Sequence, residues 1–402
     1  MRPLLSLCMM VKDEAASIRQ VLEAARPFVD QWTILDTGSV DGTQNIVREV
    51  LADIPGDLYE EPFIGYAESR NRVLALQKED DGTPDGAIFT LMLSGDEHLR
   101  EGQALREALE GFRDSGPDAF RIRLLMDDTI GSPIRIFRTA TTGHQGWHYE
   151  DAGLGVHEFE THPDPMAPIG DLPGVIEHIV SDPQRRMENI WEMHIPLLRA
   201  ALQDHPEHPR ALLFLAQSLE SLFAGFSPGE RITYAMEAMS LYMRRLQLPF
   251  TNDIERNFVR FRFLEDAKHA GIFTHVELYT RVAELAEEDP YRPEVALFHA
   301  HCAMKVRPLK DVYELAAKAA EVAEKSMGIA NQTPVSVAIA WQAHHLAAVA
   351  VKQMAKRSTG EFSAACVDLL KGHVAAGLAA GGPKMLFEGL DEIPAETSAL
   401  SS

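Results

Sequence analysis

The 402-residue chain has few cysteines and comparatively few basic residues. Its three cysteines, Cys8, Cys302 and Cys366, lie far apart and lack the spacing of a metal site. We therefore expect buried thiols in a reducing compartment rather than disulfides or a zinc centre. Lysine and arginine number 38 against 60 acidic residues, giving a net charge of −22. This charge argues against a general surface for nucleic acid, although a local basic groove is compatible with it.

The sequence also lacks long apolar runs. No stretch approaches the roughly 20 apolar residues of a membrane-spanning helix. The run from Leu4 to Val11 is too short for the apolar core and cleavage site of a signal peptide, and Lys12-Asp13-Glu14 ends it. We therefore expect a cytoplasmic protein with no membrane partner. Hydrophobic residues make up 46% of the chain, which is typical of globular domains with sizeable cores.

The first third of the chain alternates between strand and helix patterns. Runs that are apolar on both faces predict buried strands of a parallel sheet at 4–11, 32–35 and 87–93, with a further strand at 57–63. Helical spacing predicts helices at 15–26, 46–50, 66–77 and 103–112, and a polar loop covers 80–86. After these elements, 120–125 and 134–137 predict strands joined by a Gly131-Ser132-Pro133 turn, which suggests an antiparallel addition to the sheet.

Three of these strands end in acidic or small polar residues. The segments are Lys12-Asp13-Glu14, Asp36-Thr37-Gly38-Ser39-Val40-Asp41-Gly42-Thr43 and Ser94-Gly95-Asp96-Glu97. Open α/β sheets bind ligands at the carboxyl ends of their strands, and carboxylate oxygens there suit a divalent cation. An acidic turn or a helix cap is the alternative for each segment, and Asp41 fits a turn better than a ligand.

Strand patterns disappear after residue 182. Apolar stripes at helical spacing recur at 212–223, 232–246, 258–270, 275–287, 293–304, 311–327, 335–354 and 362–380. Proline and glycine breaks separate them, which is typical of a solenoid of paired helices. We predict an α/β domain at 1–182, a tetratricopeptide-like helical domain at 183–392 and a flexible tail at 393–402. The helical domain would hold an extended partner, support the α/β domain or form a homodimer.

In this order and spacing, Leu7 to Glu14, the octet Asp36 to Thr43 and Ser94 to Glu97 resemble family 2 glycosyltransferases of the GT-A fold. The resemblance is to a bacterial branch whose short catalytic domain precedes tetratricopeptide-like helices. It implies an inverting transferase that uses a nucleotide sugar, for which we favour a UDP-sugar, with Mg²⁺ or Mn²⁺. Its acceptor would be a macromolecule such as a peptide or protein, engaged by the helical domain.

The resemblance also implies roles for individual residues. Asp36 would contact the base, with Lys12, Asp13 and Glu14 lining the nucleoside pocket, and Asp96 would hold the metal. The other implied contacts are Arg70 and Asn71 near the phosphates or ribose, Ser94 and Gly95 at the donor, Glu97 and His178 near the metal, and His157 and Glu158 near the acceptor. Glu158 is our candidate base, and His157 is the rival assignment.

One departure from the family concerns the metal. The family usually has an aspartate where this chain has Ser94, so one carboxylate is missing beside Asp96. A neutral hydroxyl is a weaker ligand, which predicts a lower metal affinity. Two other functions stay open: transfer of sugar to a DNA base or other nucleic acid, and a scaffold whose transferase domain has lost activity. A transition-metal site among His144, His148 and His162 is weakly supported, because no helix is expected there.

Overall fold

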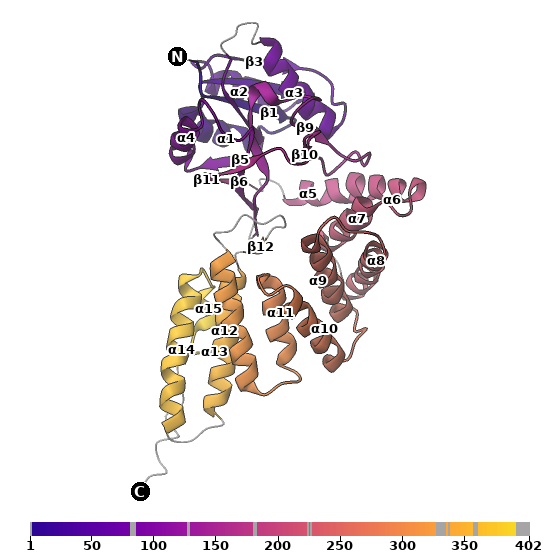
Figure 1. Ribbon diagram of the computed structural model, residues 1–402, viewed down its shortest axis with the longest axis vertical. Helices are drawn as coiled ribbons and strands as arrows, with labels where there is room; N and C mark the ends of the chain where they lie inside the picture. The colour runs from indigo at the N-terminus through magenta and orange to yellow at the C-terminus, as the bar shows by residue number, and fades with distance from the viewer. Residues whose placement is uncertain are drawn as a thin grey trace. The chain divides into compact units, whose positions relative to one another are not determined.

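The computed structural model describes residues 2–80, 86–126, 129–179, 183–222, 225, 227–326, 335–336, 338–356 and 361–390. The chain divides into two compact units (Figure 1). Unit 1 comprises residues 1–127 and 131–218, and unit 2 comprises residues 128–130 and 219–402. The division falls within helix α7 (Pro209–Ser221). The domain boundary that we predict at residue 182 marks the change from strands to helices and stays a prediction.

The sheet of unit 1 is built on the apolar strands that the sequence predicts. Its central order is β8-β4-β1-β2-β3, in which β1 pairs in parallel with both β2 and β4, and β2 pairs in parallel with β3. Strand β8 is antiparallel to β4, as the hairpin pattern suggests. The bounds are β1 Leu5–Val11, β2 Gln31–Asp36, β3 Gly56–Glu60, β4 Phe89–Ser94, β6 Ala119–Met126 and β8 Ile134–Arg138.

Helices cover both faces of this sheet, which explains why its strands are apolar on both sides. Along β1, Leu7 and Met9 pack in one core cluster with helices α1 and α2, whereas Cys8 packs in a second cluster with α3. Alternate side chains of a strand point to opposite faces, so each face needs its own cover. The helices are α1 Ile18–Ala25, α2 Thr43–Val50, α3 Tyr66–Asp80 and α4 Gly102–Gly111.

One long strand of unit 1 has no counterpart in our sequence prediction. Strand β11 (Ile169–His178) pairs in parallel with β6 and antiparallel with β5 (Glu97–Arg100). Its register shifts between Asp171 and Val175, and Gly174 there has a φ of 105°. Leu172-Pro173-Gly174 has the composition of a turn but forms a bulge within the strand, so the local pattern hides it. Short strands β9 (His148–Glu150) and β10 (Phe159–Thr161) form a separate pair.

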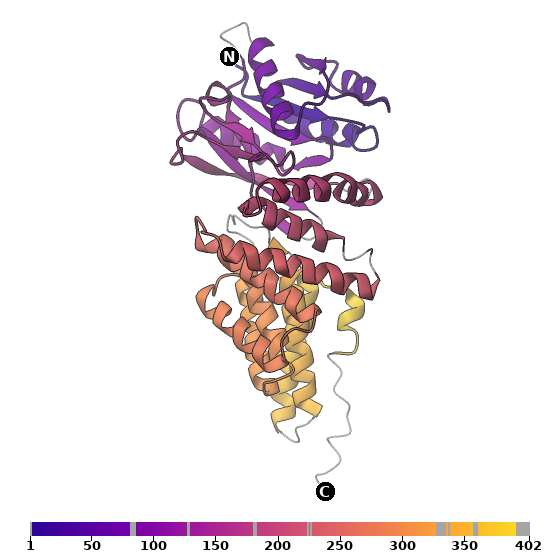
Figure 2. The same ribbon diagram turned by 90° about the vertical axis from the view of Figure 1, so that its right-hand side faces the viewer.

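Helices follow the last strand of unit 1. Helix α5 (Pro183–Asn189), a π-helical segment η3 (Ile190–His194) and α6 (Ile195–Asp204) precede α7. Unit 2 continues with antiparallel helices that pack against their chain neighbours (Figures 1 and 2). They are α8 Pro228–Leu246, α9 Asp253–His269, α10 His275–Glu288, α11 Pro293–Ala303, α12 Leu309–Ser326, α13 Ile339–Lys356, α14 Glu361–Ala379 and α15 Lys384–Phe387.

Caps fix where several of these helices begin. Ser227 before α8 and Thr274 before α10 each form a capping box, and Asn252 caps α9 by accepting from Glu255 N at 2.9 Å. One predicted helix is wrong at its start, because Val335–Ser336 form strand β12 and α13 begins at Ile339. Within unit 2, β12 pairs antiparallel with Thr129 and Ile130 of β7 (Thr129–Gly131).

The predicted fold class, an α/β region followed by an all-α region, is confirmed. The three cysteines are free and buried, as expected. In the part of the chain that the structure describes, none of the helices has the length and hydropathy to cross a bilayer. Most of the predicted polar loop at 80–86 and the whole predicted tail at 393–402 lie outside the described residues.

Unit 2 buries a group of polar side chains between α7, α8 and α9. Glu220 accepts hydrogen bonds from the Tyr242 hydroxyl at 3.0 Å and from Arg262 Nε at 3.1 Å. Asp266 is only 2% exposed, and its Oδ2 has no hydrogen-bond partner among the described residues. Burial, and then the neighbouring Glu220 carboxylate, raise the pKa of Asp266 to about 9. Asp266 is therefore protonated at neutral pH.

This carboxyl makes the stability of unit 2 depend on pH. The unfolded chain releases the Asp266 proton near its ordinary pKa of 3.8, whereas the folded chain holds it until about pH 9, so stability falls as pH rises between these values. Asp266→Asn should remove this fall. We expect the variant's advantage over wild type to grow by up to about 1.4 kcal/mol per pH unit in this window.

Urea denaturation followed by circular dichroism at several pH values measures the effect. Asp253→Asn is the matched control, because Asp253 lies on the same helix with a side chain that is 78% exposed. A difference between Asp266→Asn and wild type that does not change with pH would contradict a protonated Asp266.

Candidate functional site

Parallel pairing brings the three acidic strand ends to one edge of the sheet. Val11 at the end of β1 lies opposite Asp36 at the end of β2, and Met10 lies opposite Ser94 at the end of β4. The segments that follow these strands therefore lie side by side. This is the edge at which open α/β sheets bind ligands.

Hydrogen bonds join the loop after β1 to the loop after β2. Asp13 N donates to Ser39 Oγ at 2.8 Å, and Val40 N donates to Asp13 Oδ1 at 2.8 Å. Asp41 Oδ2 accepts from Ala15 N at 2.8 Å, so Asp41 serves the turn, as its sequence context favours. These contacts hold the two loops in one arrangement. Lys12, the first residue of the loop after β1, is exposed.

Asp36 is fully buried, and only one of its two carboxylate oxygens accepts hydrogen bonds from the described residues. Its Oδ1 accepts from Gly38 N at 2.9 Å and from Ser39 N at 2.7 Å, which closes the turn after β2. Within the described ranges its Oδ2 has no hydrogen-bond partner. A buried acceptor without a donor costs about 1–3 kcal/mol, and such groups often mark a ligand site. Asp36 therefore closes the turn, and its predicted contact with a base stays a prediction.

The turn after β4 places Asp96 beside His178. Strand β11 pairs with β5 so that His178 lies opposite Glu97, and His178 Nε2 comes within 3.0 Å of Asp96 Oδ2. The hydrogen bond with Asp96 raises the pKa of His178. Among the residues that the structure describes, no cluster of three or more His, Cys, Asp or Glu side chains is arranged to hold a metal. Asp96 and His178 thus form a hydrogen-bonded pair, and their role as metal ligands stays a prediction.

Glu97 stabilises this turn instead of facing an open site, and Glu14 lies close beside it. Glu97 is buried, and its Oε2 accepts from Ser94 N at 2.9 Å. Gly95 allows the close approach of the neighbouring loop, because a Cβ at this position would lie 2.5 Å from Glu14 Cγ. The structure therefore brings Ser94, Gly95 and Glu97 to the expected edge, but it gives the Glu97 carboxylate partners within the protein.

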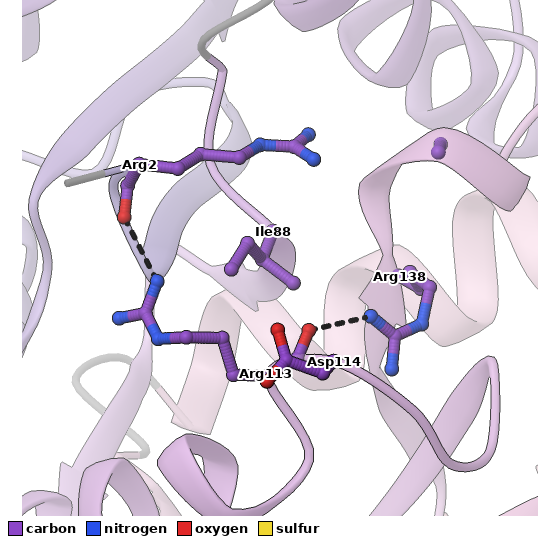
Figure 3. A pocket seen from close by; sticks show the side chains of 6 residues that line it. Arg2, Ile88, Arg113, Asp114 and Arg138 are labelled. Atoms are coloured by element: carbon purple, nitrogen blue, oxygen red, sulfur yellow. Dashed lines mark hydrogen bonds between the residues drawn. The ribbon is translucent and has the colours of Figure 1, made fainter.

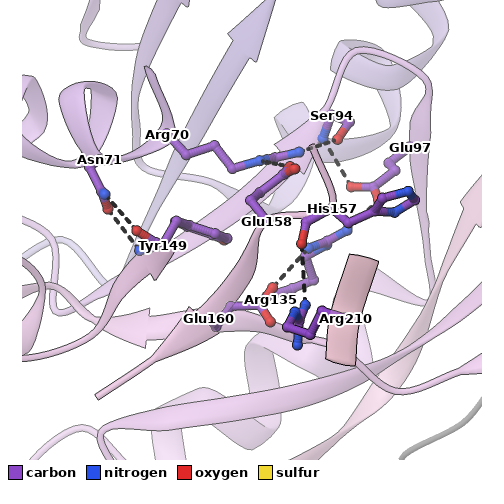
Figure 4. A network of polar contacts seen from close by, with 10 residues as sticks. All are labelled: Arg70, Asn71, Ser94, Glu97, Arg135, Tyr149, His157, Glu158, Glu160 and Arg210. Carbon is purple, nitrogen blue, oxygen red and sulfur yellow. Dashed lines mark hydrogen bonds and ion pairs between the residues drawn. The ribbon is translucent and has the colours of Figure 1, made fainter. Parts of the chain in front are cut away.

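Two buried arginines connect this turn to the segment before and within β10 (Figure 4). Arg70 of α3 donates to Glu158 Oε1 at 2.8 Å and to Ser94 Oγ at 3.2 Å. Arg135 of β8 donates to Glu97 Oε1 at 2.8 Å and to Glu160 Oε1 at 3.2 Å. The side chains of Arg70 and Arg135 are 10% and 13% exposed. Buried pairs of this kind fix geometry, because neither charge can separate without losing its counter-charge.

The electrostatics of the network distinguish its two β10-side carboxylates. Burial tends to raise the pKa of Glu158, but the Arg70 charge and hydrogen bond outweigh it and lower that pKa. For Glu160 burial prevails, so its pKa is raised despite the charge of Arg135. Glu158 is consequently an ionised carboxylate paired with a guanidinium, which makes it a weak proton acceptor in this arrangement.

The remaining predicted residues have other partners. His157 lies just before β10, and its ring stacks on Phe214 at 4.2 Å while Glu158 points to Arg70. Asn71 exchanges two hydrogen bonds of 2.8 Å with the backbone of Tyr149, so its amide anchors α3 to β9. Its predicted contact with a donor stays a prediction.

Sequence reasoning did not select Arg135 and Glu160. A signal was available for Arg135, because a charged residue inside a predicted core strand needs a buried partner. The identity of that partner depends on tertiary contacts that no local pattern shows.

A cavity of about 360 Å³ lies at the opposite edge of the sheet (Figure 3). It is lined by residues that precede β1 and β4 and by residues near the ends of α4 and β8: Arg2, Ile88, Arg113, Asp114, Arg138 and Ala140. Its arginines donate to main-chain carbonyls, Arg113 to Arg2 O at 3.0 Å and Arg138 to Phe112 O at 2.9 Å. These groups brace the chain where the strands begin, away from the acidic strand ends.

No protein-family model matches the chain. Over 141 residues it is 30% identical to a TPR repeat-containing protein of Synechococcus elongatus, covering 33% of this chain and 31% of that protein. The chain thus spans about a third of the length of this curated relative. The crystal structure of S. aureus TarS 1-349 covers 71% of this chain and 92% of its own at 13% identity, with a TM-score of 0.33. Neither likeness is extensive enough to assign the chain to a family.

The buried network makes a prediction about stability. Arg135→Gln should leave Glu97 and Glu160 without their shared counter-charge, and we expect a loss of about 3–5 kcal/mol in the free energy of unfolding. Arg48→Gln is the control, because the Arg48–Glu60 pair is exposed and worth about 0–1 kcal/mol. Chemical denaturation measures both. Equal, small losses would show that the buried pairs do not stabilise unit 1.

Proposed function

We propose that this protein is a nucleotide-sugar-dependent, metal-assisted glycosyltransferase of the GT-A family 2 kind, inverting, with a macromolecular acceptor. The observation that carries the proposal is that Asp36 and the Asp96–His178 pair lie at the same end of one parallel sheet, after strands β2 and β4 on either side of β1. This edge offers a hydrogen-bond acceptor for a base and, beside it, oxygen and nitrogen ligands for a cation.

The chemistry of Asp36 supports a particular class of nucleotide. Its unpartnered Oδ2 is a buried acceptor, so it favours a base whose ring presents an N–H donor. Uracil has such a donor at N3, which agrees with a UDP-sugar. Guanine also has a ring N–H, whereas adenine and cytosine present an unprotonated ring nitrogen at the corresponding position. Comparison of UDP with ADP therefore tests the assignment.

Asp96 and His178 fit a divalent cation. Their Oδ2 and Nε2 atoms are 3.0 Å apart in a hydrogen bond, so both atoms would hold one cation once Nε2 gives up its proton. Diphosphate oxygens and water would complete the shell. A nitrogen ligand favours Mn²⁺ over Mg²⁺. When bound, the cation would supply positive charge to the diphosphate leaving group.

The chain's own residues account for the other requirements of transfer. The acceptor oxygen forms a bond to the anomeric carbon as the bond from that carbon to the diphosphate oxygen breaks, and the acceptor's proton passes to a base. Glu158 is the candidate base, because His157 is turned away onto Phe214. For Glu158 to accept a proton, its ion pair with Arg70 must loosen, because that pair lowers the pKa of Glu158. The helices of unit 2 would engage the acceptor.

Asp36→Asn tests the base contact without disturbing the turn. Asparagine can keep the accepting oxygen toward Gly38 and Ser39 but replaces the free oxygen with an NH₂ donor. We expect UDP binding in the presence of EDTA to weaken by about 1.5–3 kcal/mol, as for the loss of a hydrogen bond to a charged group. Calorimetry measures it. Asp53→Asn, at an exposed ion pair, is the control, and an unchanged affinity of Asp36→Asn would remove Asp36 from the site.

Asp96→Asn tests the cation. We expect Asp96→Asn to lose the Mn²⁺-dependent part of UDP binding. Ser94→Asp should strengthen that part by about 1–3 kcal/mol, because it adds a charged oxygen, and an ion pair of the new carboxylate with Arg70 would reduce the gain. Titration of Mn²⁺ into each protein with UDP present measures both. If wild type and Asp96→Asn respond alike while Ser94→Asp alone gains metal-dependent binding, the protein is an inactive scaffold and the proposal fails.

A further inference from the structure

The segment from Asp151 to Glu158 follows a strained path between β9 and β10. Ala152 has a φ of 55° and His157 a φ of 60°, although neither residue is glycine. A side chain in this left-handed region costs roughly 1–2 kcal/mol per residue. Such a conformation persists only where surrounding contacts enforce it, and strain of this kind clusters at functional sites.

Contacts from the helices after β11 enforce the conformation at His157. Its ring stacks on Phe214 of α7, with centroids 4.2 Å apart and planes 11° apart, and meets His194 of η3 edge-on at 5.2 Å. Arg210 of α7 donates to the His157 carbonyl at 3.3 Å, and its guanidinium lies 4.0 Å from the centre of the Phe159 ring. The residues on both sides of Glu158 are therefore held by α7.

The His157 ring contributes packing rather than charge. Burial, and then the neighbouring His194, lower the pKa of His157 to about 4. A neutral imidazole stacks on Phe214 without bringing a second cation near Arg210. Stacked aromatic pairs contribute about 0.5–1.5 kcal/mol beyond their buried area, which is comparable to the strain at one left-handed residue.

The conformation of His157 sets the direction of the next residue, Glu158. The turn at His157 sends its own side chain to α7 and sends Glu158 the other way, to Arg70 at 2.8 Å (Figure 4). Two residues later Glu160 reaches Arg135, the partner of Glu97. We propose that Phe214 and Arg210 are positioning residues of the transferase site: by holding His157 in its left-handed conformation, α7 sets the place of Glu158. This inference rests on the proposed function.

A positioning role differs from a merely structural one in its kinetic effect. Displacement of Glu158 should lower turnover without altering the Asp36 and Asp96 side of the site, where the donor would bind. A misplacement of about 1 Å can reduce a rate by up to about 100-fold. We therefore expect Phe214→Ala to reduce kcat by about 10- to 100-fold while the affinity for UDP with Mn²⁺ stays close to wild type. Phe214→Tyr keeps the stacking ring and should restore most of kcat.

Release of UDP from UDP-glucose and UDP-N-acetylglucosamine measures turnover, and calorimetry with UDP and Mn²⁺ measures donor binding. Phe273→Ala is the matched control, because this aromatic packs against Phe263 in unit 2 and should leave kcat unchanged. Hydrogen exchange over residues 151–160 should increase in Phe214→Ala and return with tyrosine.

Two failures can be told apart. If wild type binds no UDP with Mn²⁺ and releases none, the proposed function fails, and the catalytic role of α7 with it. If wild type binds and turns over but Phe214→Ala keeps its kcat, or loses kcat only in proportion to folded protein, the positioning role alone is overturned.

Discussion

The shared burial of Arg70 and Arg135 with three carboxylates is the constraint on which the rest of the site depends. The two guanidiniums bind the turn after β4, through Ser94 and Glu97, to Glu158 and Glu160 at the start of β10. Exposed ion pairs contribute little, but a buried charge left alone costs several kcal/mol, so breaking one of these buried pairs is costly. The turn that carries Asp96 is consequently held in one geometry.

The sheet and the segments that follow it place the other candidate residues. Apolar strands buried on both faces align in parallel, and their carboxyl ends bring Asp36 and Asp96 to one edge. The bulged strand β11 places His178 beside Asp96. Helix α7 contacts the rings of His157 and Phe159. The buried oxygen of Asp36 and the Asp96–His178 pair therefore lie at the edge where we propose that a nucleotide sugar and its cation bind.

The sequence alone predicted those parts that depend on local pattern. Strands β1, β2 and β4 were recognisable because they are apolar on both faces, and Asp36 and Asp96 because they directly follow such strands. Strand β11 was missed because Leu172-Pro173-Gly174 has the composition of a turn, and β12 because two residues cannot show a period. The partners of Glu97 and Glu158 could not be predicted, since pairing of buried charges is decided by tertiary packing. The same holds for Ser94, whose hydroxyl accepts a hydrogen bond from Arg70.

Anomalous diffraction from crystals grown with Mn²⁺ and UDP tests the central claim most directly, because it locates the cation without assuming an acceptor. The account predicts one Mn²⁺ peak within coordination distance of both Asp96 and His178, with the uracil ring against Asp36. A peak elsewhere, or UDP bound among the arginines at the opposite edge of the sheet, would contradict it.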